Sequence, residues 1–437
     1  MKNIIKIWLF VFILLSNLFA QQYKPEASLT SLSKKVNKTN TTNINILAVM
    51  VEFQEDTDGA TFGDGKFGSI YKKDYGKSII DPLPHDKQYF ENHLLFAKNY
   101  YSKVSENKVT IDYTVLPNVI KVSKKMRDYS PLPKSSDFTP LGEFSKEVWQ
   151  MVVAENPNLD FSQFNLFAVF HAGVGRDVNL PGSVGNERDL PSVYLSQGEL
   201  KKIFGADFTG FPATNALITN SIILPETESR EISGITGDVL LELSINGLIV
   251  SSIASHMGLP DLFDTNTGLS AIGRFGLMDG QAIFAYSGLF PPEPSAWEKI
   301  YLGWEIPHEI SNSGQYQIVL TAKLVSQLLD SRIIKIPINN SEYFLIENRQ
   351  RDAKKDGITL TIADNGSIIT KTFPKDTTGF SIAGVDSLQG VILDVDEFDW
   401  AVPGNGIVIW HIDESVINSK IAENKINTDK FHRGVDV

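Results

Sequence analysis

The residues whose spacing best fits a chemical role lie at positions 251–261 of the 437-residue chain. A helix that holds a catalytic zinc ion places two histidines at positions i and i+4, and a glutamate beside the first histidine acts as general base. In the extended pattern a glycine comes three positions after the second histidine, and a further ligand or acidic residue three positions later. Gly258 and Asp261 hold those last two positions. Ser251 and Ser255 replace the histidines, and Ser252 replaces the glutamate.

These serines argue against conventional zinc proteolysis. A serine hydroxyl is a poor zinc ligand compared with imidazole or carboxylate. The nearby His256 is rotated about 100° from Ser255 on a helix, and its own i−4 partner is Ser252. We therefore expect no intact catalytic residue in the motif. The remaining candidate metal ligands are Asp261, His256 and Glu298.

A serine nucleophile is a different interpretation of the same stretch. Ser252 and His256 are four residues apart, so their side chains can lie on one helix face and form a hydrogen bond. A nucleophilic serine also needs an oriented base and an oxyanion hole, and the sequence indicates neither. A serine in a buried helix more often donates to a carbonyl of the preceding turn, which is the interpretation we favour.

Two further histidines could take part in a relocated site. His171 ends an apolar strand-like run, and His411 shares one face of a predicted strand with Asp413. Buried structural histidines and ordinary strand packing explain both positions equally well. We favour those structural roles.

Acidic residues form three groups of interest. Two groups could supply oxygen ligands to calcium, although neither matches an EF-hand loop and a solvated acidic loop is the default interpretation. They are Asp56, Asp58 and Asp64, and Asp394, Asp396 and Asp399. In the third group, Asp261, Asp264 and Asp279 are expected to form a local polar network that holds the turn after the helix.

The elements that must position these residues alternate between strands and helices. Strand-like runs at 44–53, 109–113 and 166–170 are separated by helical periodicity at 88–102 and 141–154. The motif helix is predicted to start near Thr236 or Asp238 and to run to Met257, since residues 243–257 carry no Asp, Glu, Lys or Arg. Beyond about residue 311 short strand-like runs such as 315–320 follow. The order predicts an α+β protein that ends in a β-rich, sandwich-like region.

Composition and the N-terminus suggest export. A basic start, an apolar run at 7–15 and Leu18-Phe19-Ala20 form the parts of a secretory signal peptide over residues 1–20. No later stretch reads as a membrane span, so the mature chain should be secreted, or displayed at the cell surface, without a transmembrane segment. The net charge of −12 argues against nucleic acid as a partner. Because the chain has no cysteine, disulfides and thiolate metal sites are excluded.

Several ordered signatures together resemble immune inhibitor A-type secreted metallopeptidases. Gly258 to Asp264 resembles the segment after that family's zinc helix, and residues 275–280 resemble its methionine turn, with Met278 at the methionine. Further similar stretches lie at 99–101, 104–105, 295–299, 302–304, 342–349 and 406–414. The resemblance spans roughly residues 44–437 and marks Gly258, Asp261, Asp264 and Met278 as motif scaffold.

The resemblance implies a zincin-like domain at 43–310, after a flexible polar lead-in at 21–42. A truncated β-rich domain is expected at 311–437, with an insertion at about 352–403. Family membership would imply zinc, but the zinc ligands are missing here, so no cofactor is assigned. We expect a non-catalytic pseudopeptidase that binds a peptide or protein. Alternatives are an active metal-dependent endopeptidase with a relocated site, built from residues such as His171, His256 or His411, and a structural cell-surface module.

Overall fold

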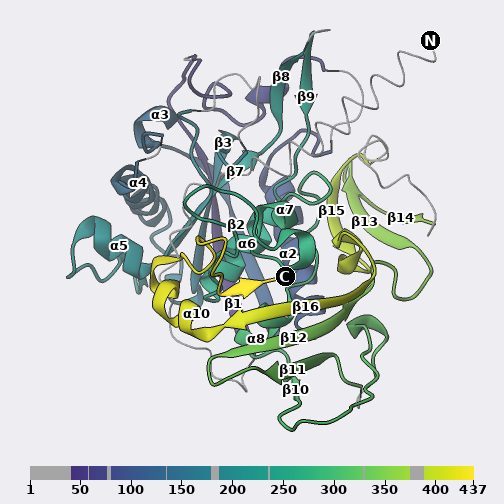
Figure 1. The fold of residues 1–437 in the computed structure, drawn as a ribbon. Coiled ribbons are helices and arrows are strands. Elements are labelled where there is room, and N and C mark those ends of the chain that lie inside the picture. The colour runs from purple at the N-terminus through teal and green to yellow at the C-terminus, as the bar shows by residue number, and fades with distance from the viewer. Residues whose placement is uncertain are drawn as a thin grey trace.

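The computed structural model describes residues 41–437 except 58, 76–79, 134, 179–186, 235–236, 328–329 and 375–387. The predicted signal peptide at 1–20, nearly all of the lead-in at 21–42, and Asp58 therefore lie outside the described residues. Figure 1 shows helices on both sides of a central sheet, with further sheets built from the later part of the chain. Because helices and several sheets are combined in this way, the predicted α+β class is confirmed.

A five-stranded sheet forms the first half of the protein, in the order β2-β1-β3-β7-β4. Its strands are β1 (Thr42–Glu52), β2 (Val109–Lys121), β3 (Leu166–Val174), β4 (Val193–Leu195) and β7 (Ser221–Thr227). The first four in this order are parallel to one another, whereas β4 runs antiparallel to β7 at the edge of the sheet. β1 and β3 lie in the interior of the sheet, which explains why their sequences are almost continuously apolar.

Alternate side chains of β1 point to opposite faces of this sheet, and different helices pack against each face. Ile44, Ile46, Ala48 and Met50 belong to the apolar cluster that also contains the buried residues of α2 (Lys87–Val104) and α6 (Asn246–His256). Leu47, Val49 and Val51 belong to the cluster of α4 (Thr139–Glu155) and α5 (Gln197–Phe204). Successive strand residues point to opposite faces, so the sheet is covered on both sides (Figure 1).

Two more sheets come from the last third of the chain. One has the order β10-β11-β12-β16-β17, with strands at His308–Glu309, Ile333–Pro337, Glu342–Arg349, Gly406–Asp413 and Val435–Asp436. The other has the order β14-β13-β15, with strands at Ser367–Phe373, Ile358–Asp364 and Val391–Val395, inside the insertion expected at 352–403. The apolar cluster of α2 and α6 extends without a break into both sheets, from Ile44 to Val435.

The remaining elements are short. The hairpins are β5 (Phe211–Pro212) with β6 (Leu217–Ile218), and β8 (Arg230–Gly234) with β9 (Gly237–Leu241). The other α-helices are α3 (Met126–Tyr129), α7 (Gly280–Ile283), α8 (Ala296–Tyr301) and α10 (Glu414–Lys420). Single turns of 3-10 helix lie at 69–71, 161–163, 273–275, 323–325, 398–401 and 421–423.

Two sequence predictions about elements are wrong. The motif helix starts at Asn246, not near Thr236 or Asp238, because residues 237–241 pair with residues 230–234 in the β8–β9 hairpin. Residues 315–320 form no strand; Leu320 makes only an isolated bridge to Ser331. The apolar side chains of this segment face solvent, with Val319 80% exposed, so no neighbouring strand buries them.

A buried network of ionic groups joins the two halves of the chain. Lys299 on α8 lies 3.1 Å from Glu293 and 3.7 Å from Glu347 on β12. Arg349, also on β12, donates to both carboxylate oxygens of Asp399 at 2.7 and 2.5 Å. Removing one member of such a buried pair costs about 3–5 kcal/mol, since its partner stays buried without its counter-charge.

Candidate functional site

Helix α6 places the three motif serines at one pocket. Ser251, Ser252 and Ser255 are buried and line this pocket together. The Ser251 hydroxyl donates to the Leu248 carbonyl at 3.0 Å, and the Ser255 hydroxyl donates to the Ser251 carbonyl at 3.2 Å. Two of the three hydroxyls thus bond the preceding turn of their own helix, as the sequence suggested.

The opposite wall of the pocket comes from residues that the motif search missed. The lining residues are Asp177, Ser192, Val193, Tyr194, Leu248, Ser251, Ser252, Ser255, Asp261, Phe263, Met278 and Ile283. The space inside has room for only a few water molecules. Asp177 follows strand β3 by three residues, and residues just past a strand end are frequent at functional sites, which is the one sequence signal that pointed to it.

His256 does not pair with Ser252. Its Nδ1 atom lies 3.0 Å from the hydroxyl of Tyr194, and the two rings meet edge to face. Burial lowers the pKa of His256 to about 4, so its ring is neutral at physiological pH. Within the described residues the Ser252 hydroxyl has no hydrogen-bond partner, so the serine–histidine pair that a serine nucleophile would need is not formed.

The donor set around α6 does not suit zinc. His256 supplies one imidazole, which already contacts Tyr194. The three motif serines supply only hydroxyls. Structural and catalytic zinc sites use three or four nitrogen, sulfur or carboxylate ligands. We therefore assign no zinc ligand in this pocket.

The turn after α6 is held by backbone geometry. Gly258 has φ of +97°, a left-handed conformation that only glycine adopts without strain. The Leu262 N–H donates to the Met278 carbonyl at 2.7 Å, which joins this turn to the segment that resembles a methionine turn. Met278 itself is buried and lines the pocket.

Glu298 is a structural carboxylate. It accepts hydrogen bonds from the N–H groups of Leu277, Met278 and Ser295 at 3.1, 2.9 and 2.5 Å. It also completes the capping box of α8 with Ser295. Burial raises the pKa of Glu298, although these hydrogen bonds oppose that effect. The residue supports the turn at Met278 and does not line the pocket.

The three aspartates expected to form one network serve separate turns. Asp261 and Asn424 bond to each other, Asp264 accepts from Thr267 at 2.6 Å, and Asp279 accepts from Ala271 and Ile272 at 2.9 and 3.1 Å. Burial raises the pKa of Asp279 despite these bonds. Each carboxylate fixes a different stretch of backbone around the pocket.

The histidines of the relocated-site hypothesis lie apart from one another. His171 is fully buried on β3 against the ring of Phe53, and burial lowers its pKa to about 4. His411 is partly exposed on β16, 3.5 Å from Glu342. Its neighbour Asp413 caps α10 by accepting from Ser415 and Val416.

The two aspartate groups considered for calcium are occupied by other partners. Asp56 pairs with Lys125 and Asp64 with Lys72, while Asp394 pairs with Lys103, Asp396 accepts from Thr359 and Asp399 binds Arg349. Cationic side chains already neutralise four of these five carboxylates. The described members of neither group bring their carboxylates to one point.

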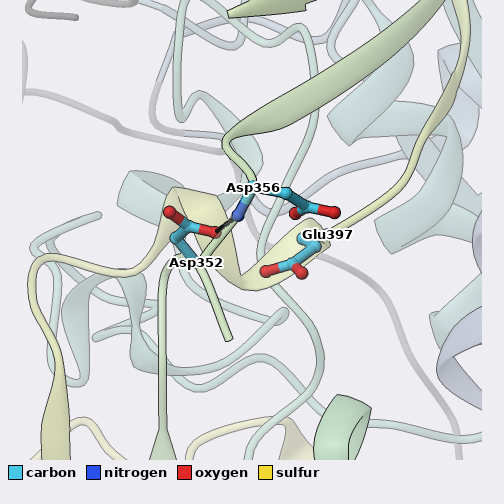
Figure 2. Close-up of side chains that lie close together, drawn as sticks. All are labelled: Asp352, Asp356 and Glu397. Carbon is cyan, nitrogen blue, oxygen red and sulfur yellow. Dashed lines mark hydrogen bonds between the residues drawn. The ribbon is translucent and has the colours of Figure 1, made fainter. Parts of the chain in front are cut away.

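A different acidic cluster does converge, in the inserted region. Asp352, Asp356 and Glu397 bring carboxylate oxygens within 4.8 Å of one another, as Figure 2 shows. Both Glu397 oxygens already accept backbone N–H groups, from Ala353 at 2.7 Å and Lys354 at 3.1 Å. The sequence did not indicate this cluster because Glu397 lies 41 residues after Asp356, the nearer of the two aspartates.

Comparison with known proteins gives no relative: no family model and no curated protein matches this chain. Among the described residues, no helix is long and apolar enough to cross a membrane.

Proposed function

We propose that this protein is an exported, zincin-like pseudopeptidase of the immune inhibitor A type that binds a peptide or protein without cleaving it. One observation carries the proposal: Ser251, Ser252 and Ser255 line a single pocket with Asp261 and Met278. In the zinc-helix pattern these positions belong to the catalytic face. Hydroxyls there leave the pocket without a metal-activated water.

The edge strand beside the pocket supports a peptide ligand. β4 pairs with β7 on one side, and on its other side it pairs with no strand among the described residues. Val193 and Tyr194 of β4 also line the pocket. An extended peptide can add to such an edge through main-chain hydrogen bonds, with a side chain directed at the pocket.

The alternatives make different predictions. An active metal-dependent endopeptidase with a relocated site requires stoichiometric metal and cleavage that EDTA abolishes. A structural cell-surface module requires neither cleavage nor saturable peptide binding.

The test uses one purified preparation of the mature chain. We expect no EDTA-sensitive cleavage of reduced, alkylated casein, together with saturable binding of fluorescent casein peptides measured by anisotropy. Ser252→Leu, which fills the pocket, should weaken binding at least tenfold. Ser419→Leu on the exposed face of α10 is the matched control and should bind normally. EDTA-sensitive cleavage by the unmodified chain would overturn the proposal.

A further inference from the structure

A second acidic group lies directly behind the pocket. It contains three carboxylates that are almost completely removed from solvent, with two arginines beside them. The members are Asp177, Asp189, Glu228, Arg176 and Arg230. If all five groups are ionised, this cluster carries one net negative charge in the protein interior. Buried charges of this kind require a counter-charge or a proton.

Hydrogen bonds from arginine neutralise only part of this buried negative charge. Arg230 donates to one oxygen of Glu228, Oε2, and to the carbonyls of Gly175 and Val178. The other oxygen, Glu228 Oε1, has no hydrogen-bond donor among the described residues although its side chain is completely buried. An orphaned acceptor on a fully buried carboxylate indicates a missing partner.

Gly175 lets the carboxylates of Glu228 and Asp177 pack against its backbone. A Cβ atom built on Gly175 would lie 1.8 Å from Glu228 Oε1 and 2.8 Å from Asp177 Oδ2. Both oxygens therefore face the same small volume above the glycine Cα. Two carboxylate oxygens are acceptors only, so they cannot satisfy each other without something positive between them.

Asp177 connects this group to the serine-lined pocket. Asp177 lines that pocket beside Ser192 and Ser252. Ser252 is only 8% exposed, and its hydroxyl bonds to no described residue; the Ser192 hydroxyl is likewise buried without a partner. Calcium binds six to eight oxygens from carboxylates, other protein oxygens and water. A site of this composition, with room for a few waters, meets that requirement.

We propose that a hard cation of the calcium type binds between the carboxylates of Asp177 and Glu228, completed by pocket hydroxyls and water. The ion neutralises the excess buried charge and supplies the partner that Glu228 Oε1 lacks among the described residues. It would tie the segment after β3 to the segment after β7, beneath the pocket. The site shares Ser252 with the proposed peptide pocket, but calcium binding is measured without a peptide. It uses none of the aspartates that the sequence suggested for calcium.

The test titrates CaCl2 into the EGTA-treated mature chain, with binding measured by calorimetry and stability by thermal unfolding. We expect one calcium ion per chain and a Tm rise of several degrees. Glu228→Gln and Asp177→Asn should each abolish both effects, and Ser252→Ala should weaken binding several-fold. Glu397→Gln, in the separate acidic cluster of Figure 2, is the matched control and should keep them.

Two results would contradict the calcium proposal. If a proton joins the two carboxylates, the unmodified chain will not respond to millimolar calcium, and the proposal fails. It also fails if Glu397→Gln removes the response while Asp177→Asn retains it. Should Glu228→Gln not fold, Asp177→Asn and Ser252→Ala still decide the question.

Discussion

Asp261 and Asn424 bond to each other twice, although 163 residues separate them. The Asn424 amide donates to Asp261 Oδ2 at 2.6 Å, and the Asp261 N–H donates to Asn424 Oδ1 at 2.8 Å. Both side chains are buried. The pair attaches the turn after α6 to the last part of the chain, so the pocket lining at Asp261 depends on residues 163 positions further along.

Asp261→Ala should lower the free energy of unfolding by about 1–3 kcal/mol, because the Asn424 amide loses a buried charged acceptor. Asn424→Ala should cost a similar amount. The double variant should cost clearly less than both single losses combined, since the two residues share one interaction. Chemical denaturation of the four proteins measures this coupling, with the exposed Asp429→Ala as control. Additive losses would contradict the pairing.

Glu298→Gln tests the support of the turn at Met278. A glutamine offers one acceptor oxygen where the glutamate offers two, and its NH2 group would face backbone donors. We expect a loss of about 2–3 kcal/mol in unfolding free energy. Glu143→Gln removes only an exposed pair with Lys146 and should change little. A near-neutral Glu298→Gln would show that this carboxylate is dispensable for the turn.

Acid should destabilise the protein partly through His171. Its pKa is about 4 when folded and about 6.5 when unfolded, so the unfolded chain binds the proton first as the pH falls. The stability contribution of neutral His171 is therefore complete above pH 6.5 and is lost as the pH falls to about 4. For one buried histidine the loss is about 3 kcal/mol.

The check compares unfolding free energies at several pH values between 7 and 4. His171→Gln should flatten the pH dependence in this window, whatever it does to stability at pH 7. His411→Gln, on an exposed side chain, is the control and should leave the dependence unchanged. Parallel curves for His171→Gln and the unmodified chain would refute the assignment.

Restoring the zinc-helix residues tests the interpretation of the pocket. The triple variant Ser251→His, Ser252→Glu and Ser255→His should gain one zinc ion per chain by elemental analysis, because the two imidazoles would face one pocket beside Asp261. The single variant Ser252→Glu should bind no zinc. A folded triple variant with no zinc would mean that α6 does not present the geometry of a zinc helix.

Strong periodicity explains what the sequence could predict. The helices at 88–102 and 141–154 and the strand at 166–170 were expected close to their observed bounds, because their apolar residues repeat with a clear period and face a core. The run at 237–241 looked like the start of α6, but a hairpin partner at 230–234 competes for it. The local sequence pattern does not show whether such a run continues a helix or pairs with a neighbouring strand.

The candidate site shows the same limit. The spacing of Ser251, Ser252 and Ser255 correctly grouped them on one face, since helix geometry alone determines that. Asp177 and Tyr194 reach the pocket from other elements, and only tertiary packing brings them there. Glu298 was a candidate metal ligand, yet backbone donors occupy its carboxylate.

The buried ionic network limits how this chain can be divided. A boundary at residue 310 would leave Glu293 and Lys299 on one side and Glu347, Arg349 and Asp399 on the other. A fragment ending there would expose an apolar surface and strip Lys299 of one of its two counter-ions. Replacing the part before residue 310 with that of another protein would require a part after residue 310 that completes the same ion pairs. The two parts should therefore be inherited and exchanged together.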